Sequence, residues 1–146
     1  MESVIGILKD LLSTQGLAVL STHGGGQPYA SLVAFLASAD CAHIWFATQR
    51  ATRKYANMNA DSRVALLVDS RQNEDKDFHA ARAATAVGIV HEVRQDHRQG
   101  VVEEMLRKHP YLSVFLHSPS CALLQVDVET YYVVQRFQEV TEYHLS

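Results

Sequence analysis

Hydrophobic residues in the first half of the chain recur with a helical period and then with a strand-like one. Helical spacing near the N-terminus predicts a short amphipathic helix through Ile5, Leu8, Leu11 and Leu12. Gly16 is placed to end this helix. Residues 17–22, 29–36 and 43–48 have strand-like composition, and turn-forming residues separate them at positions 24–28 and 38–40. We therefore expect a meander of three antiparallel strands.

The second half alternates between helical and strand-like patterns. We expect a helix from Lys54 to about Asn59, a strand at residues 63–69, a charged loop at 70–81 and a strand at 85–93, where Gly88 marks a bulge or a close backbone approach. A helix at residues 96–109 ends before Pro110, and a hairpin at 122–128 and 131–137 turns around positions 127–130. Because the strand at 63–69 is apolar on both faces, a helix or another subunit should cover its second side.

These elements indicate a mainly β fold with flanking helices. Strands outnumber helices, and closely spaced turns favour antiparallel pairing. Closing such a sheet into a small barrel removes its exposed edges, so a barrel is the economical arrangement. The length of 146 residues is that of one domain, which we expect to span residues 1–146.

Charge and composition restrict the partners and the location. The net charge of −3 argues against non-specific binding to nucleic acid, which needs a basic surface. The first residues lack the basic and apolar segments of a secretory signal, and no apolar run reaches the length of a membrane span. Cys41 and Cys121 form no CxxC pair and no disulfide framework, which favours a reduced, cytoplasmic setting.

The most specific chemical signal is the segment at residues 45–54, WFATQRATRK. An apolar strand ends at Thr48, and Thr52 precedes Arg53 and Lys54 where a helix begins. The free N–H groups of a helix start and two cations together favour a bound phosphate. Alternatively, Thr52 is only an N-cap and both cations are solvated. Cations at this end oppose the helix dipole, a mild cost that a bound anion would remove.

Other kinds of site have weaker support. The triple glycine at 24–26 lacks the following residues of a Walker loop and the spacing of a dinucleotide fold, so it predicts a hairpin turn. The eight histidines include no HExxH motif and no i, i+4 pair, and we expect no metal site. No GxSxG motif occurs, and neither cysteine lies in a recognisable catalytic context. Trp45 and Tyr29 offer stacking surfaces, although strand packing is their ordinary role.

The chain resembles the pyridoxamine 5′-phosphate oxidase-like superfamily of FMN-binding split barrels. Residues 46–54, FATQRATRK, are similar to the strand and Ser/Thr-Arg-Lys segment whose basic pair holds the FMN phosphate. Residues 28–34, PYASLVA, are similar to the strand that lines the flavin ring, and residues 63–68 and 82–88 to the two strands that follow. A narrower branch, the haem-utilisation split barrels, is similar to this chain at residues 68–73 and 81–82 and at the helix end at 105–110.

The resemblance implies a six- to seven-stranded antiparallel split β-barrel that binds FMN as a homodimer, with the cofactor between two subunits. The implied cofactor-binding residues are Ser31, Leu32, Val33, Ala47, Thr48, Thr52, Arg53 and Lys54. The last two would hold the phosphate, the two threonines would add hydroxyl contacts, and residues 31–33 would present backbone groups to the isoalloxazine ring.

The chain departs from the superfamily oxidases that act on pyridoxine phosphate. Ser31 replaces an Arg of the ring-lining strand, Leu36 a substrate-binding Lys, and Ala83 a flavin-contacting Gln. The C-terminal Arg-x-His segment of those oxidases has no counterpart in residues 131–146. These differences argue against vitamin B6 oxidation and for a reduced affinity for FMN. Haem-degrading members bind haem through a C-terminal His, for which His144 is the candidate.

Three functions remain open from the sequence. The leading hypothesis is an FMN-dependent oxidoreductase that uses a small-molecule substrate or electron donor, with catalytic residues unknown. The second is a non-catalytic module that holds flavin or haem. The third is a structural split barrel whose site has been altered.

Overall fold

The computed structural model describes residues 3–136 and 138–145. Within them the strands are β1 (Leu17–Gly24), β2 (Gln27–Ala37), β3 (His43–Gln49), β4 (Arg63–Asp69), β5 (Ala83–Glu92), β6 (Cys121–Gln135) and β7 (Glu139–His144). The helices are α1 (Val4–Thr14), α2 (Arg53–Ala60), α3 (Asp77–Ala80), α4 (Gln95–Lys108) and α5 (Ser113–Leu116), with a 3-10 turn η1 (Pro110–Leu112) before α5.

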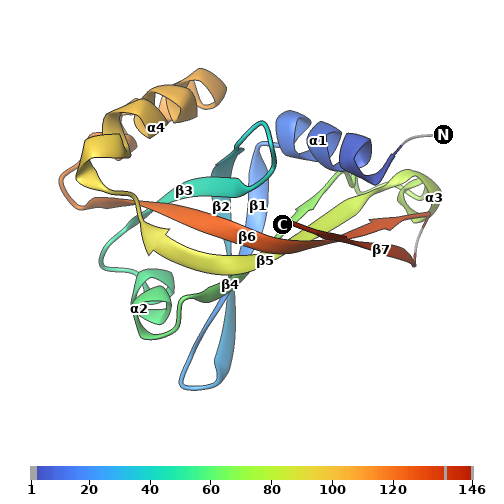
Figure 1. Cartoon of the computed structure of the whole chain (residues 1–146), viewed down its shortest axis with the longest axis horizontal. Helices are drawn as coiled ribbons and strands as arrows, with labels where there is room; N and C mark the ends of the chain where they lie inside the picture. Colours follow the sequence, from blue (N-terminus) through green and yellow to red (C-terminus); the bar gives the residue numbers. More distant parts are fainter. Residues whose placement is uncertain (1–2, 137, 146) are drawn as a thin grey trace.

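The strands form a closed antiparallel barrel. Their order is β3-β2-β1-β4-β5-β6-β7, and a second pairing, between β3 and β6, closes the first six strands into a ring. β7 lies outside the ring and pairs with the second half of β6 (Figure 1). The expected mainly β split barrel of six to seven strands is therefore confirmed.

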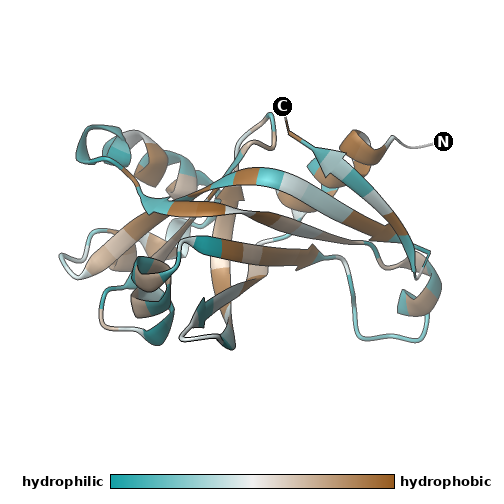
Figure 2. Cartoon of the chain, turned by 60° about the horizontal axis from the view of Figure 1, so that its bottom comes forward, coloured by the Kyte–Doolittle hydropathy of each residue, from teal (hydrophilic) through white to brown (hydrophobic). Residues whose placement is uncertain are grey.

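The core consists of alternate strand residues and of one face of α1. On β4, Val64, Leu66 and Val68 are buried, whereas Ala65 and Leu67 on the outer side are only partly covered. α1 adds the buried side chains Ile7, Leu8, Leu11 and Leu12 to the same core. Figure 2 shows hydrophobic residues concentrated on the strands and hydrophilic ones on the loop that leads into α3.

The predicted hairpin around positions 127–130 is wrong, because these residues continue β6 as one strand of 15 residues. The alternation of buried residues changes phase there, since Val128 and Tyr131 are both buried. β5 pairs with Val128 and with Thr130, which leaves Glu129 as the additional residue of a β-bulge. A bulge breaks the period of two in the same way as a turn, and this is why the sequence pattern was misleading.

Gly88 lies opposite this bulge, as its sequence context predicts. The register of β5 and β6 shifts between Val87 and Gly88. A Cβ atom on Gly88 would lie 2.2 Å from the carbonyl oxygen of Asp127, so only glycine allows this approach of the two backbones. After β6 the chain reverses direction at the turn into β7, and not at the predicted positions 127–130. The predicted last strand ends at Phe137, which lies outside the described residues.

The charged loop at residues 70–81 contains the short helix α3, which the sequence analysis did not predict. The Asp77 carboxylate accepts hydrogen bonds from the amides of Gln72 and Asn73, the shortest at 2.8 Å. These bonds hold the pKa of Asp77 below its usual range. No helix formed by residues 3–136 and 138–145 is long and apolar enough to span a bilayer.

Candidate functional site

The barrel is split where β2 and β3 separate. The β2–β3 ladder contains three residue pairs, whereas β2 pairs with β1 along eight. The amide of Phe35 donates to the carbonyl of Gly16 on the β1 side, so the odd-numbered residues of β2 direct their backbone groups toward β1. The N–H and C=O groups of Leu32 and the N–H group of Ala34 consequently point into the gap, beyond the last ladder pair of β2 and β3. This gap leaves an open strand edge inside the molecule.

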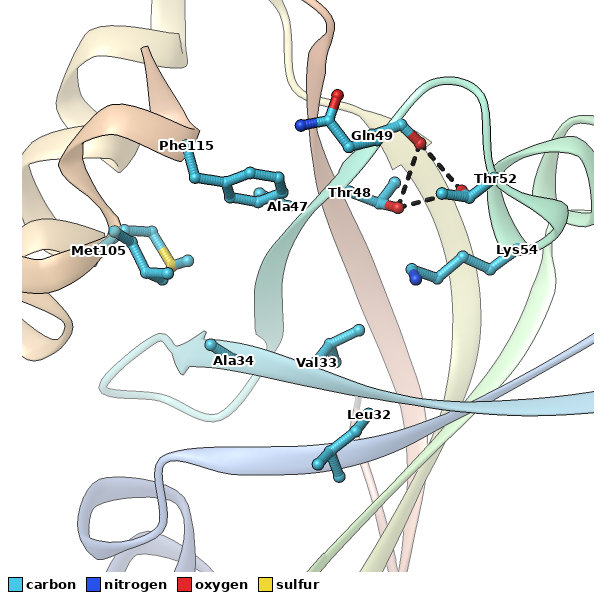
Figure 3. Close-up of a pocket in the computed structure, with 11 residues that line it drawn as sticks. Leu32, Val33, Ala34, Ala47, Thr48, Gln49, Thr52, Lys54, Met105 and Phe115 are labelled. Carbon is cyan, nitrogen blue, oxygen red and sulfur yellow. Dashed lines mark hydrogen bonds between the residues drawn. The ribbon is translucent and has the colours of Figure 1, made fainter. Parts of the chain in front are cut away.

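A pocket of about 290 Å³ occupies the gap (Figure 3). We call it the split pocket. Six of the eight predicted cofactor residues line it: Leu32, Val33, Ala47, Thr48, Thr52 and Lys54. The Val33 side chain points into the pocket and the Leu32 side chain points away from it, so β2 presents both a side chain and a backbone edge (Figure 3). The fold thus joins two segments that the sequence suggested separately.

Two threonine hydroxyls lie where β3 passes into α2. Thr52 Oγ1 donates to the carbonyl oxygen of Gln49 at 2.9 Å and accepts from the amide of Tyr55 at 3.3 Å, which caps α2. Thr48 Oγ1 lies 3.2 Å from the same carbonyl oxygen. Both hydroxyl protons therefore have a partner within the protein. A bound phosphate would receive a hydrogen bond from either threonine only after that hydroxyl rotates away from Gln49.

The two predicted cations at the start of α2 have different surroundings. Lys54 lines the split pocket, and its ammonium points back toward β2 and β3 (Figure 3). Arg53 is exposed and does not line the pocket; its guanidinium carbon lies 5.9 Å from the centre of the Tyr29 ring. The structure therefore places one member of the predicted basic pair at the pocket.

Ser31 also lies outside the pocket lining. It is on the inner side of β2, where it pairs with Leu20 of β1. Its Oγ atom is buried and has no hydrogen-bond partner among the described residues. An unpaired buried hydroxyl of this kind costs about 1–3 kcal/mol. It is two residues from Val33, so it lies on the strand face that contributes a side chain to the pocket.

Sequence reasoning missed the apolar wall of the split pocket, which consists of Met105, Leu112 and Phe115. The apolar face of α4 that carries Met105 was predicted, but its position over the barrel depends on the path of the whole segment between β5 and β6. The Phe115 ring extends from α5 toward Ala47 (Figure 3). The small Ala34 and Ala47 side chains keep the space between the strands and this wall open to a flat group.

An ion pair holds the connection between β3 and α2. Arg50 donates two hydrogen bonds to Glu92 at the end of β5, at 2.9 and 2.7 Å. The Tyr55 hydroxyl of α2 accepts from Arg50 and donates to Glu92. The Arg50 guanidinium holds the pKa of Glu92 below its usual range, in spite of partial burial. The segment that carries Thr52 is thereby tied to the barrel, which fixes the position of its hydroxyl.

His144, the candidate haem ligand, lies away from the split pocket of its own chain. It is on β7 and pairs with Thr130 in the second half of β6, whereas β3 pairs with the first half. Its Nδ1 atom lies 3.0 Å from the hydroxyl of Thr130 and its Nε2 atom 3.1 Å from the carboxylate of Glu142. Its ring is therefore held on the outside of the barrel.

Comparisons with known proteins agree with this fold. The family model described as pyridoxamine 5′-phosphate oxidase matches residues 7–135. No curated protein sequence matches the chain significantly. A haem-binding protein from Mycobacterium smegmatis is similar with a TM-score of 0.87 and 13% identity, over 99% of this chain and 59% of its own. An FAD-binding protein from Mesorhizobium loti gives 0.70 and 18%, over 90% of this chain and 94% of its own.

The haem storage protein HutZ from Vibrio cholerae is also similar, with a TM-score of 0.71 and 16% identity, over 84% of this chain and 88% of its own. At such identities the structural likeness shows the fold alone. The chain spans 59% of the length of the Mycobacterium smegmatis protein. The family model, in contrast, matches most of the chain and includes both strands of the split. The chain therefore belongs to the pyridoxamine 5′-phosphate oxidase family.

Proposed function

We propose that residues 1–146 form a single FMN-binding domain, and that it acts as an oxidoreductase on a small-molecule substrate or electron donor. The observation that carries this proposal is the split pocket, where Lys54 and two threonine hydroxyls lie at one end of an open strand edge. Family membership supports the same class of cofactor. A cytoplasmic location belongs to the proposal, because Cys41 and Cys121 are free and buried.

The donors at the start of α2 fit the phosphate of FMN. The Lys54 ammonium would form a charge-assisted hydrogen bond with it. Thr48 and Thr52 would add hydroxyl contacts, and the first amides of α2 contribute partial positive charge. Arg53 would strengthen this field from the surface, although it would have to leave the Tyr29 ring to touch the phosphate.

The rest of the pocket fits a flat ring system with a polar edge. The N–H and C=O groups of Leu32 and the N–H group of Ala34 have no strand partner among the described residues. They can hydrogen-bond with ring nitrogen and oxygen atoms, as strand edges do with a further strand. Met105 and Phe115 offer an apolar surface to the face of the ring. The pocket thus offers polar groups to the edge of an isoalloxazine ring and an apolar surface to its face.

Bound FMN supplies hydride and electron transfer, and the chain supplies placement and electrostatics. Lys54 would neutralise the phosphate and anchor one end of the cofactor. The backbone amides at the β2 edge would be fixed donors that stabilise negative charge on the ring without reorganisation. The wall of Met105 and Phe115 would exclude water from the ring on its side of the pocket.

We also propose a homodimer whose interface borders the split pocket. On the outside of the sheet, Val19 is the cross-strand neighbour of both Leu32 and Leu67. The Leu32 residue is 63% exposed in a single chain. A second copy would cover this apolar row, including the outer side of β4 for which a cover was expected.

Light scattering during size-exclusion chromatography tests the dimer. We expect the mass of two 16.3-kDa chains for the wild type. Leu67→Lys should give a monomer that binds FMN more weakly, because the charge cannot be buried in the interface. Lys9→Glu changes an exposed charge on α1 and is the matched control. A monomeric wild type that binds FMN fully would contradict this part of the proposal.

A second candidate function is a non-catalytic module that holds flavin or haem. It is favoured by two similar structures that are named as haem-binding and haem storage proteins. Mass spectrometry of the cofactor extracted from the purified protein, followed by NADH and NADPH oxidation assays, separates the two functions. We expect FMN and turnover. FMN without turnover would favour the module, and uptake of haem but not of FMN would overturn the proposed cofactor.

A further inference from the structure

A second pocket, of about 350 Å³, lies between the first turns of α4, the end of β5 and residues 116–121. We call it the α4 pocket. Its lining is mainly polar and includes Arg50, Glu92, Gln95, Arg98, His117 and Ser118. None of the predicted cofactor residues lines it. Its size lies at the lower end of the range for small-molecule sites, about 300–1,000 Å³.

The charges in the α4 pocket do not balance. Glu92 accepts two hydrogen bonds from Arg50, so these two groups neutralise each other. Arg98 is half-buried, and its Nη2 atom donates to the carbonyls of Leu116 at 3.1 Å and Cys121 at 3.4 Å. Within residues 3–136 and 138–145, Arg98 has no carboxylate at ion-pair distance. Arg50 and, to a smaller extent, Arg98 hold the pKa of Glu92 below its usual range, but one carboxylate cannot neutralise two guanidiniums. The pocket therefore keeps one positive charge in excess, and a partly desolvated cation favours an anion.

Neutral polar groups surround this cation. Gln95 and Ser118 line the pocket and contribute an amide and a hydroxyl. The Nδ1 atom of His117 lies 2.7 Å from the carbonyl oxygen of Ser113, so Nδ1 carries the proton and Nε2 is the ring atom left for a ligand. The pocket therefore combines one unbalanced positive charge with several polar groups that bear no formal charge.

We propose that the α4 pocket binds a small organic carboxylate, whose charged group accepts a hydrogen bond from the Nη1 group of Arg98. A carboxylate carries one negative charge and matches the one unbalanced cation. A phosphate dianion would place a second negative charge near Glu92 without a partner. The amide of Gln95 and the hydroxyl of Ser118 would hydrogen-bond with the remaining polar groups of the ligand.

Residues 49 and 50 contact Ser120, and these contacts lie between the α4 pocket and the split pocket. The Ser120 hydroxyl donates to the side-chain oxygen of Gln49, and the backbone amide of Arg50 donates to the carbonyl of Ser120 at 3.0 Å. Gln49 lines the split pocket and Arg50 lines the α4 pocket. Carboxylate binding thus does not require FMN, and this inference stands independently of the proposed cofactor.

Calorimetric titration of the full chain with lactate, a hydroxy acid with one negative charge, tests the proposal at constant ionic strength. The neutral amide lactamide and inorganic phosphate are the comparison probes. We expect lactate to bind, lactamide not to bind, and phosphate to bind more weakly than lactate. Arg98→Gln should weaken lactate binding roughly 10- to 150-fold, the range for a lost hydrogen bond to a charged group.

Two further variants keep the test informative if Arg98→Gln misfolds. Gln95→Glu leaves every contact of Arg98 in place and adds a negative charge to the pocket, so it should also weaken lactate binding. An acidic residue in the first turn of α4 suits the helix dipole. Arg107→Gln, on the exposed side of the same helix, should have no effect. Lactate affinity that is unchanged by Gln95→Glu, equal affinity for lactamide, tighter binding of phosphate, or no binding of lactate would each overturn the proposal.

Discussion

The Oγ1 atoms of Thr48 and Thr52 lie 3.2 Å apart, one at the end of β3 and the other at the N-cap of α2. Both hydroxyls also approach the carbonyl oxygen of Gln49. This small group joins the end of a strand to the start of a helix. It thereby fixes the position of Lys54, which follows two residues after the cap, relative to the open edge of β2.

Substitution of Thr52 should separate its capping role from its role in binding. Thr52→Ala removes the N-cap, which should lower the free energy of unfolding by about 1 kcal/mol in urea denaturation. It should also weaken FMN binding, because one hydroxyl near the phosphate is lost. Thr52→Ser keeps the hydroxyl and should retain both properties. If Thr52→Ala lowered stability but left FMN affinity unchanged, the hydroxyl would have a structural role only.

Gly88 and Gly100 form a matched pair for a stability measurement. Gly88→Ala places a Cβ atom 2.2 Å from the carbonyl oxygen of Asp127, so β5 and β6 must move apart. We expect a loss of roughly 1–3 kcal/mol in the free energy of unfolding, the usual cost of overpacking. Gly100→Ala meets no atom within 4 Å in α4 and should raise stability by about 0.5–1 kcal/mol. Equal effects of both changes would show that the bulge tolerates a side chain.

The partly buried Lys108 makes the free energy of unfolding depend on pH in a defined direction. Its Nζ atom donates to the carbonyl of Leu12 at 3.1 Å and lies 3.9 Å from the centre of the Phe35 ring. Burial lowers the pKa of Lys108 to about 8, from its ordinary 10.5. Between these values the unfolded chain binds more protons than the folded one, so this lysine makes the free energy of unfolding rise with pH.

Urea denaturation of the wild type and of Lys108→Met between pH 7.5 and pH 10 measures this contribution. The variant keeps the apolar stem and removes the charge. We expect the stability of the wild type to increase relative to that of the variant by about 1–2 kcal/mol across this range, after allowance for partial exposure. Parallel stability curves would show that the ammonium remains as well solvated in the folded state as in the unfolded one.

Local patterns were sufficient to predict most of the barrel. Strands β1 to β5 and the helices α1, α2 and α4 follow from period and from turn residues, because each buries one face in the same core. The pattern failed at Glu129, where the phase of burial changes. One sequence cannot distinguish a bulge from a turn, because the difference depends on whether a partner strand continues alongside, as β5 does.

Only part of the candidate site belongs to one local segment of the sequence, and only that part could be predicted from local pattern alone. Thr52 and Lys54 belong to one local segment, and the structure places both at the split pocket. Arg53 belongs to that segment too, but its side chain leaves the helix in another direction and lies over Tyr29. Met105 and Phe115 come from elements whose position depends on long-range packing. Their contribution to the pocket therefore carries no signal in the local sequence.

The titration of FMN and of riboflavin into the wild type and into Lys54→Ala tests whether Lys54 holds the phosphate of the cofactor. Flavin fluorescence reports both affinities. We predict that Lys54→Ala weakens FMN roughly 10- to 150-fold and riboflavin, which lacks the phosphate, much less. Arg53→Ala should have a smaller effect on FMN, and Phe115→Ala should weaken both flavins similarly because it alters the ring wall. Equal losses of FMN and riboflavin affinity in Lys54→Ala would contradict the assignment of this lysine to the phosphate.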